Sequence, residues 1–483
     1  MNCMAGVLFF APAIIYCLCP HITHKSNFMF SFISIPHKAY LLAGFLALAA
    51  VMTGSCKQDT GAQEVKISDQ ISIPQLLERQ TNVGPAEEQT QIRKVYQDAI
   101  VALKANADDL KQYLNLATVF ITEGRLTGNN NYYSNAALKM LDLVIGRKPS
   151  DKNLLFEGLS LKSAVLLNMH QFKAALQVAE EGQKINDYNA GIYGALVDAN
   201  VEMGHYDAAV KNCDQMLSIR PDLRSYSRAS YLRQLHGDNK GACDAMRMAV
   251  EAGVPGMEST EWARVQWGDL YANSGNLDTA QMIYNTALSF RPGYPYAEMG
   301  LARVAAARKD YDEAIAHTRN AIKVLSEASF VSYLGDMYLL KGDKEKAAQI
   351  YKEVAQQLES GEKEQPGNGI RHNGNRELAM AYLNLGNYDK ALAYARTDYA
   401  MRPDNIDAND LMAWILYRKG DYKQAALYTE KVFHTREKNA NLSYKAGLVY
   451  AAAGDRDKAK QYEEEAASIS RYIDPRITAS VKL

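Results

Sequence analysis

The sequence predicts an all-α protein built as a stack of helical hairpins. The main observation is a Gly-x-x-x-x-Ala phrase that recurs along the second half of the chain, and its last two intervals are each 34 residues. A fixed period of this length is typical of helix pairs that pack mainly on their neighbours in sequence. The phrase begins at Gly204, Gly275, Gly342, Gly386, Gly420 and Gly454.

Each part of the phrase has a structural reason. The glycine ends the first helix and turns the chain at little steric cost, and the alanine lets the second helix approach the first. Ahead of the glycine lies an apolar, small and aromatic triad, as in Leu334, Gly335 and Tyr338, whose small member permits close helix packing. A proline then stops the second helix 17 residues after the turn, at Pro221, Pro292 and Pro403.

Spacing, residue type and order together resemble the tetratricopeptide repeat (TPR) family. The resemblance implies a right-handed superhelical α-solenoid of about ten TPR helix-turn-helix units. We expect a degenerate N-terminal unit and cap over residues 88–155, in which Arg125 to Tyr133 forms a long loop, and a nine-repeat solenoid over residues 156–472. The predicted repeat starts lie near residues 156, 190, 223, 261, 295, 328, 372, 406 and 440.

The amino terminus predicts export and a lipid anchor. Residues 40–52 form a short apolar run between a basic flank and Gly54-Ser55-Cys56, which is typical of a signal peptide. This region resembles the lipobox of bacterial lipoproteins, which implies a signal peptide over residues 1–55 and acylation of Cys56. The start codon is then either Met1 or Met29. We expect residues 56–87 to be a flexible tether and residues 473–483 a C-terminal tail.

By the same resemblance, Lys57 after the cysteine favours the outer membrane of the bacterial cell envelope, on either the periplasmic face or the cell surface. The alternative is a membrane-spanning segment at residues 5–19. Cys213 and Cys243 are predicted to be small buried residues, although a disulfide between them is open in an exported protein.

Composition and motifs argue against several classes of function. The net charge is −1, which gives no electrostatic footprint for nucleic acid. The sequence has no Gly-rich phosphate loop, no His-Glu-x-x-His and no Gly-x-Ser-x-Gly motif. The histidines and carboxylates are scattered over different repeats. We therefore expect no enzyme activity, no catalytic residues, no metal site and no cofactor.

In this family the first helices line a groove through positions 2, 5, 9 and 12 of each repeat. The resulting mixture of acids, arginines and aromatic residues suits an interaction surface. The ninth positions hold no asparagine, so a clamp for a terminal carboxylate is not expected, and their acids suit a peptide with positive charge. The predicted inner-face residues are Asp198, Tyr231, Trp262, Asp269, Tyr296, Arg303, Asp336, Arg376, Trp414, Tyr417 and Tyr444.

The sequence thus predicts a non-enzymatic, lipid-anchored scaffold or adaptor that binds peptide segments or partner proteins of an envelope assembly. The alternative is an outer-membrane lipoprotein that captures glycans or peptides. The sequence leaves open whether the chain's own tail occupies the groove.

Overall fold

The computed structural model describes residues 64–80, 83–363 and 372–480. The predicted signal peptide, Met29 and Cys56 lie outside these residues. The chain divides into two compact units, of which one ends at Leu76 and the other runs from Leu77 to the C-terminus. The described part of the first unit is a small antiparallel hairpin of β1 (Glu64–Lys66) and β2 (Ser72–Pro74), in which Val65 pairs with Ile73. This hairpin lies within the segment that the sequence predicted to be a tether.

The second unit is helical throughout its described length. It begins with α2 (Ala86–Ala105), continues through twenty helices that form ten hairpins, and closes with the short α23 (Pro475–Ser480). The hairpins are α3/α4 (Leu110–Thr127, Asn130–Gly146), α5/α6 (Lys152–Asn168, Phe172–Ile185), α7/α8 (Ala190–Met203, Tyr206–Ile219), α9/α10 (Leu223–Leu235, Asn239–Glu251), α11/α12 (Glu258–Asn273, Leu277–Phe290), α13/α14 (Pro295–Ala307, Tyr311–Val324), α15/α16 (Ala328–Leu340, Lys344–Lys363), α17/α18 (Asn375–Asn384, Tyr388–Met401), α19/α20 (Ile406–Lys419, Tyr422–Val432) and α21/α22 (Ala440–Ala453, Arg456–Ile469).

This architecture confirms the predicted all-α solenoid of about ten hairpins. Six of the first helices begin at the residue predicted from the sequence, namely 190, 223, 295, 328, 406 and 440. First helices of successive hairpins contact one another directly, as α5 does with α7 and α11 with α13. They therefore form a continuous layer, and the predicted inner-face residues all lie on helices of this layer.

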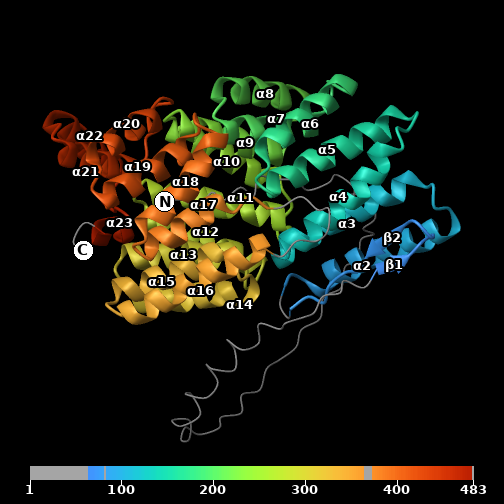
Figure 1. Ribbon diagram of the computed structural model, residues 1–483, viewed down its shortest axis with the longest axis horizontal. Helices are drawn as coiled ribbons and strands as arrows, with labels where there is room; N and C mark the ends of the chain where they lie inside the picture. Colours follow the sequence, from blue (N-terminus) through green and yellow to red (C-terminus); the bar gives the residue numbers. More distant parts are fainter. Residues whose placement is uncertain (1–63, 81–82, 364–371, 481–483) are drawn as a thin grey trace, which may run out of the picture. The chain divides into compact units, whose positions relative to one another are not determined.

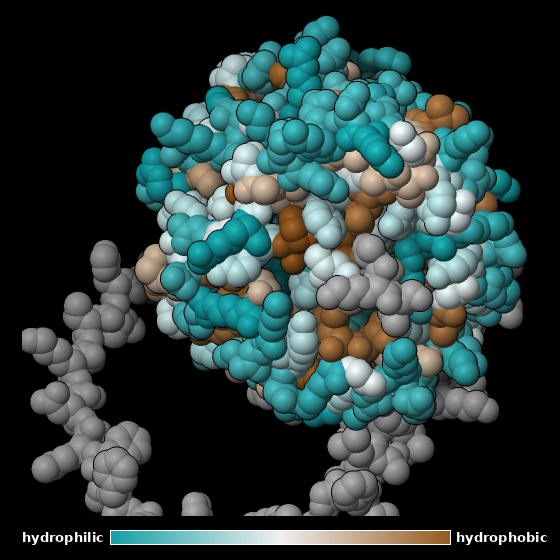
Figure 2. All heavy atoms as spheres, turned by 90° about the vertical axis from the view of Figure 1, so that its left-hand side faces the viewer, coloured by the Kyte–Doolittle hydropathy of each residue, from teal (hydrophilic) through white to brown (hydrophobic). Residues whose placement is uncertain are grey.

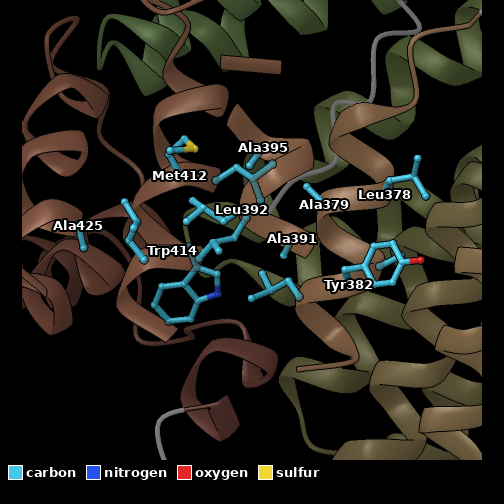
Figure 3. Packing of buried hydrophobic residues seen from close by; sticks show 14 of the residues in the cluster. Leu378, Ala379, Tyr382, Ala391, Leu392, Ala395, Met412, Trp414 and Ala425 are labelled. Atoms are coloured by element: carbon cyan, nitrogen blue, oxygen red, sulfur yellow. The ribbon is translucent and has the colours of Figure 1, made fainter. Parts of the chain in front are cut away.

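Small residues set the spacing between the helices. In the cluster drawn in Figure 3, Ala391 and Ala395 of α18 lie between the side chains of α17 and α19 and are almost completely buried. The larger side chains Leu378, Leu392 and Trp414 fill the space around them. Because alanine has only one methyl group, the backbones approach closely, and each hairpin buries its apolar face against the next.

A second set of contacts joins hairpins that are far apart in the sequence. Turns and loops at residues 169–239 meet loops at residues 373–438, at separations of 199 to 204 residues, and Figure 1 shows α17 to α20 beside α7 to α10. We call this contact the seam. It pairs Asn373 with Met169, Arg402 with Glu202, Asn405 with Val201, Ile406 with Tyr206, and Asn239 with Lys438.

The seam has the spacing of about six repeats. The same spacing recurs outside it, where the Arg291 guanidinium contacts the Glu88 carboxylate across 203 residues. At Gly204, an added Cβ would lie 2.4 Å from the carbonyl carbon of Asp404, so the turn glycine also makes room for the distant loop. The hairpins therefore contact more than their sequence neighbours.

The predicted long loop from Arg125 to Tyr133 is wrong. Helix α3 runs on to Thr127, the chain turns at Gly128 with a φ of 74°, and α4 begins at Asn130. Tyr133 is fully buried and stacks on Phe120 at 6.1 Å. Burial of this aromatic pair holds the Asn-rich segment in a helix, against the loop preference of its composition. The two described cysteines, Cys213 and Cys243, are free.

Candidate interaction face

The predicted inner-face residues are less exposed than those of an open groove. Asp198 and Trp414 are buried, with 1% and 6% of their surfaces exposed, and the other nine are partly buried. Most of them are engaged by side chains of neighbouring hairpins. The face is therefore a packed polar layer, in which each charged group has a definable partner.

Several charges of this face pair within the stack. The Arg228 guanidinium donates two hydrogen bonds to the Asp198 carboxylate, at 2.8 and 2.5 Å, and burial raises the pKa of Asp198 to about 6. Arg376 donates to Asp407 of the following hairpin at 3.0 Å. In both pairs the partner comes from the next hairpin along the chain, so these charges hold successive repeats in register.

The aromatic residues of the face serve mainly as packing. Tyr296 donates its hydroxyl hydrogen to the Glu327 carboxylate at 2.9 Å. The rings of Trp414 and Tyr417 stack with centroids 5.1 Å apart, and the Lys445 ammonium lies 5.6 Å from the centroid of Trp414. The other three aromatic residues pack against apolar clusters. Tyr231 packs against the cluster of α7 and α9, Trp262 against the clusters that extend from α9 to α13, and Tyr444 against the cluster that includes α19.

Asp269 on α11 forms a three-residue site with two neighbours. It accepts a hydrogen bond at 2.5 Å from the hydroxyl of Tyr284, which lies 15 residues later on α12. Arg303 on α13 donates to the same carboxylate at 2.5 Å. An added Cβ at either Gly268 or Gly300 would lie 2.5 to 2.6 Å from the ring of Tyr284, so both glycines make space for it. The acid is thus satisfied entirely from its own and the next hairpin.

Asp336 on α15 forms a site of the same design. Tyr351, again 15 residues later, donates its hydroxyl hydrogen at 2.7 Å, and an added Cβ at Gly335 would lie 2.6 Å from its ring. The next hairpin offers Met380 at the ninth position, and its Asn384 amide is 3.5 Å away. The arginine of this site is Arg476 of the C-terminal helix α23.

The tail is anchored on the inner face at several points. Arg476 donates to Asp336 at 3.2 Å and to Asp474 at 2.5 Å, and its guanidinium lies 4.8 Å from the centroid of the Tyr333 ring. Ile477 is 5% exposed and packs with the cluster of α17 and α19. Figure 2 views the face on which α21 to α23 lie, and apolar side chains gather near its middle within a hydrophilic rim.

Sequence reasoning missed Tyr284, Tyr351 and Arg476. The signal for the two tyrosines was present, because both follow a Gly-Asp pair by the same 15 residues. Arg476 lies outside the repeats, and a repeat pattern cannot place a segment that does not follow it.

A compact charged cluster lies at the seam rather than on the inner face. A small cavity there is lined by His170, Glu377 and Arg402, and the ring centroids of His170 and His372 are 4.4 Å apart. Burial, together with His170, lowers the pKa of His372 to about 4. Over residues 64–80, 83–363 and 372–480, no group of three His, Cys, Asp or Glu residues is arranged to hold a metal ion.

A comparison with family models matches two segments of the chain, residues 265–323 and 376–430, to the tetratricopeptide repeat. They include the hairpins that carry Asp269, Arg303 and Trp414, so the inner-face residues of these segments occupy positions in recognised repeats. No curated protein matches the chain.

Solved structures of other helical-repeat proteins are similar at low identity. PilF of Pseudomonas aeruginosa is 22% identical with a TM-score of 0.26, over 42% of this chain and 88% of that chain. A tetratricopeptide repeat protein from Parabacteroides merdae is 20% identical with a TM-score of 0.32, over 54% and 97%. The human IFIT1 dimer with m7Gppp-AAAA is 14% identical with a TM-score of 0.41, over 79% and 87%. At TM-scores this low, the likeness carries no argument about function.

Within the described residues, no helix has both the length and the apolar character needed to cross a bilayer.

Proposed function

We propose that this protein is a non-enzymatic, lipid-anchored adaptor of the bacterial cell envelope, which binds peptide segments of partner proteins on the inner face of its solenoid. Helical-repeat scaffolds of this type are suited to protein interaction. The anchor is the part of the proposal that rests on sequence, through the lipobox-like Gly54-Ser55-Cys56.

The observation that carries the proposal is the seating of the tail on the inner face. A short segment that is not part of any hairpin places a cation on Asp336 and an aliphatic side chain on the α17–α19 cluster. The face therefore has the chemistry to hold a peptide, because it offers one charged contact and one apolar contact to a segment from outside the stack.

The glycan-capture alternative is less favoured. Carbohydrate recognition of this kind needs exposed aromatic rings, whereas Trp414 is only 6% exposed and Tyr296 is hydrogen-bonded to Glu327.

A photo-crosslinking experiment in the native host tests the adaptor role. A benzoylphenylalanine replaces Met380 on the inner face in one strain and Met282 in the other. Met282 is the matched control because it lies on α12, a second helix, and is 62% exposed. We expect discrete crosslinked proteins from position 380 and none of them from position 282. The same crosslinks at both positions, or none at 380, would contradict the inner face as the binding surface.

The anchor is tested separately by palmitate labelling of the wild type beside Cys56→Ala, with protease added to whole cells. Labelling that disappears in the variant supports acylation, and protease sensitivity then distinguishes the cell surface from the periplasm. Equal labelling, or no labelling of either protein, would remove the lipid anchor from the proposal.

A further inference from the structure

The Asp336 site differs from the other acidic sites of the inner face in the origin of its cation. Asp198 and Asp269 each receive an arginine from the following hairpin, Arg228 and Arg303 respectively. At the position that Arg303 occupies in its repeat, the hairpin after Asp336 has Met380, which has no charge to offer. Among these three acids, Asp336 is the one whose arginine comes from outside the hairpins.

The tail supplies that counter-ion. Helix α23 is six residues long; its Arg476 contacts Asp336, and Ile477, like Ile473 just before the helix, packs on the α17–α19 cluster. The backbone N–H of Asp474 donates to the side-chain oxygen of Asn441 at 2.9 Å, which fixes the entry of the tail. An arginine and the aliphatic residue that follows it are thus held in two adjacent positions on the face.

From this arrangement we infer that the Asp336 site is a docking site for an arginine of a partner protein's peptide segment, followed by an aliphatic residue, and that the tail occupies the site until such a segment displaces it. This inference rests on the adaptor role proposed above, because that role supplies the partner protein. The chemistry of the site does not depend on that role.

The chemistry of the site suits an arginine in particular. The Asp336 carboxylate offers an oxygen acceptor on one side, and the Tyr333 ring offers a face for a planar cation on the other. A guanidinium can donate to a carboxylate and stack on an aromatic ring at the same time, whereas a lysine ammonium lacks the planar group. Burial raises the pKa of Asp336, whereas the charge of Arg476 acts to lower it, so a cation in this position favours the ionised carboxylate.

Competition between the tail and a peptide provides the test. A fluorescent peptide with the sequence of residues 470–480 is titrated by anisotropy against the full-length wild type, Arg476→Ala, and Arg476→Ala combined with Asp336→Asn. Arg471→Ala is the matched control, because it removes the same charge from an exposed tail residue that stacks on Tyr472.

We expect Arg476→Ala to bind the peptide about tenfold or more tightly than the wild type and Arg471→Ala, because the tethered tail competes at a high effective concentration. The double variant should lose this gain. Equal binding by all four proteins, or a gain that survives Asp336→Asn, would overturn the inference.

Hydrogen exchange of the wild type gives a second readout that needs no variant. We expect the amides of α23 to exchange by local opening, well before those of α15. Exchange of α23 only with global unfolding would make the tail a permanent part of the fold and would also overturn the inference.

The two proposals fail in different ways. Peptide binding by Arg476→Ala without any crosslinked partner would leave the arginine site in place and remove the adaptor role. Crosslinked partners whose yield is the same in the wild type and Arg476→Ala, with no peptide binding, would leave the adaptor role and remove the arginine site.

Discussion

The Asp269 and Asp336 sites have the same construction but obtain their arginines differently. In both, the acid accepts a hydrogen bond from a tyrosine 15 residues later, and the exposed fraction of the acid's side chain is 15%. Arg303 is fixed on the adjacent helix α13, whereas Arg476 arrives on the six-residue α23. One site therefore joins two neighbouring repeats, and the other is completed by a segment that lies outside the repeats.

This difference shows how one repeat can acquire a different binding site while keeping the same helical hairpin. Where the repeat has Met380 in place of an arginine, the acid takes its arginine from a segment outside the repeats, while the neighbouring tyrosine and glycine stay the same. The two acids have the same exposed fraction and the same tyrosine spacing, so substitutions can be compared between the sites.

The largest contrast is expected from the acids themselves. Asp269→Asn leaves Arg303 without its carboxylate, and we expect it to lower the free energy of unfolding by about 2 kcal/mol. Asp336→Asn should cost about 1 kcal/mol or less, because Arg476 keeps its bond to Asp474 and can leave with the tail. Urea unfolding monitored by circular dichroism measures both, and equal losses would mean that the tail is as integral as a neighbouring repeat.

The glycines beside the tyrosines should give the next largest effect. An added methyl group at Gly268 or Gly335 would lie 2.5 to 2.6 Å from a buried tyrosine ring. Overpacking outweighs the better helix propensity of alanine, so each change should cost about 1 kcal/mol. Gly268→Ala should cost more, because Gly300 confines Tyr284 on its other side. Gly361→Ala is the control, since nothing lies within 4 Å of its added Cβ, and a loss there would discredit the packing explanation.

Removing the tyrosine hydroxyls tests whether each hydroxyl is energetically coupled to the arginine that contacts the same carboxylate. Tyr284→Phe and Tyr351→Phe each remove one hydrogen bond to a carboxylate and should each cost about 1 kcal/mol. In a double-mutant cycle, Tyr351→Phe and Arg476→Ala should couple, because both side chains contact Asp336. Additive losses in that cycle would show that Tyr351 does not help to hold the tail arginine.

The smallest effect is expected from pH. Burial raises the pKa of Asp336, although Arg476 acts to lower it. A carboxyl whose folded-state pKa is raised contributes stability below its unfolded pKa, about 3.9, and loses that contribution as the pH rises through the folded pKa. Asp336→Asn should remove this decline, by less than about 1 kcal/mol.

Asp474 titrates in the opposite sense. Burial acts to raise its pKa, but pairing with Arg476 outweighs burial and lowers it. Its contribution is therefore present above the unfolded pKa and is lost as the pH falls. Urea midpoints between about pH 3 and pH 6 distinguish the two carboxyls, and an unchanged slope in Asp336→Asn would contradict the assignment.

The repeat pattern predicted the hairpins well because each turn is decided locally. Gly204, Gly275 and Gly454 adopt positive φ values of 81°, 81° and 92° where the sequence places the end of a first helix. The pattern also placed Asp269 and Asp336 on the inner face. It could not place Arg476, because the tail follows no period. It also could not predict the seam, because contacts across 200 residues depend on the accumulated rotation between repeats.

The composition of residues 125–133 led to the wrong prediction of a loop, because local preferences do not include the effect of burial. Asparagine and glycine favour turns when only local preferences act, but burial of Tyr133 against Phe120 contributes more than those preferences. The effect of Tyr133 becomes clear only from its contact with Phe120 in the structure.

The seam has a consequence for recognition. A solenoid in which only neighbours touch behaves as a spring, and a partner that bends or stretches it must do elastic work. Here Arg402 pairs with Glu202, and the backbone N–H of Ile406 donates to the Tyr206 hydroxyl, each across 200 residues. These contacts fix the pitch of the superhelix. Such a receptor is preorganised, and association costs it little ordering of its own. The binding face therefore selects segments that already fit its shape, because it does not deform to accommodate others.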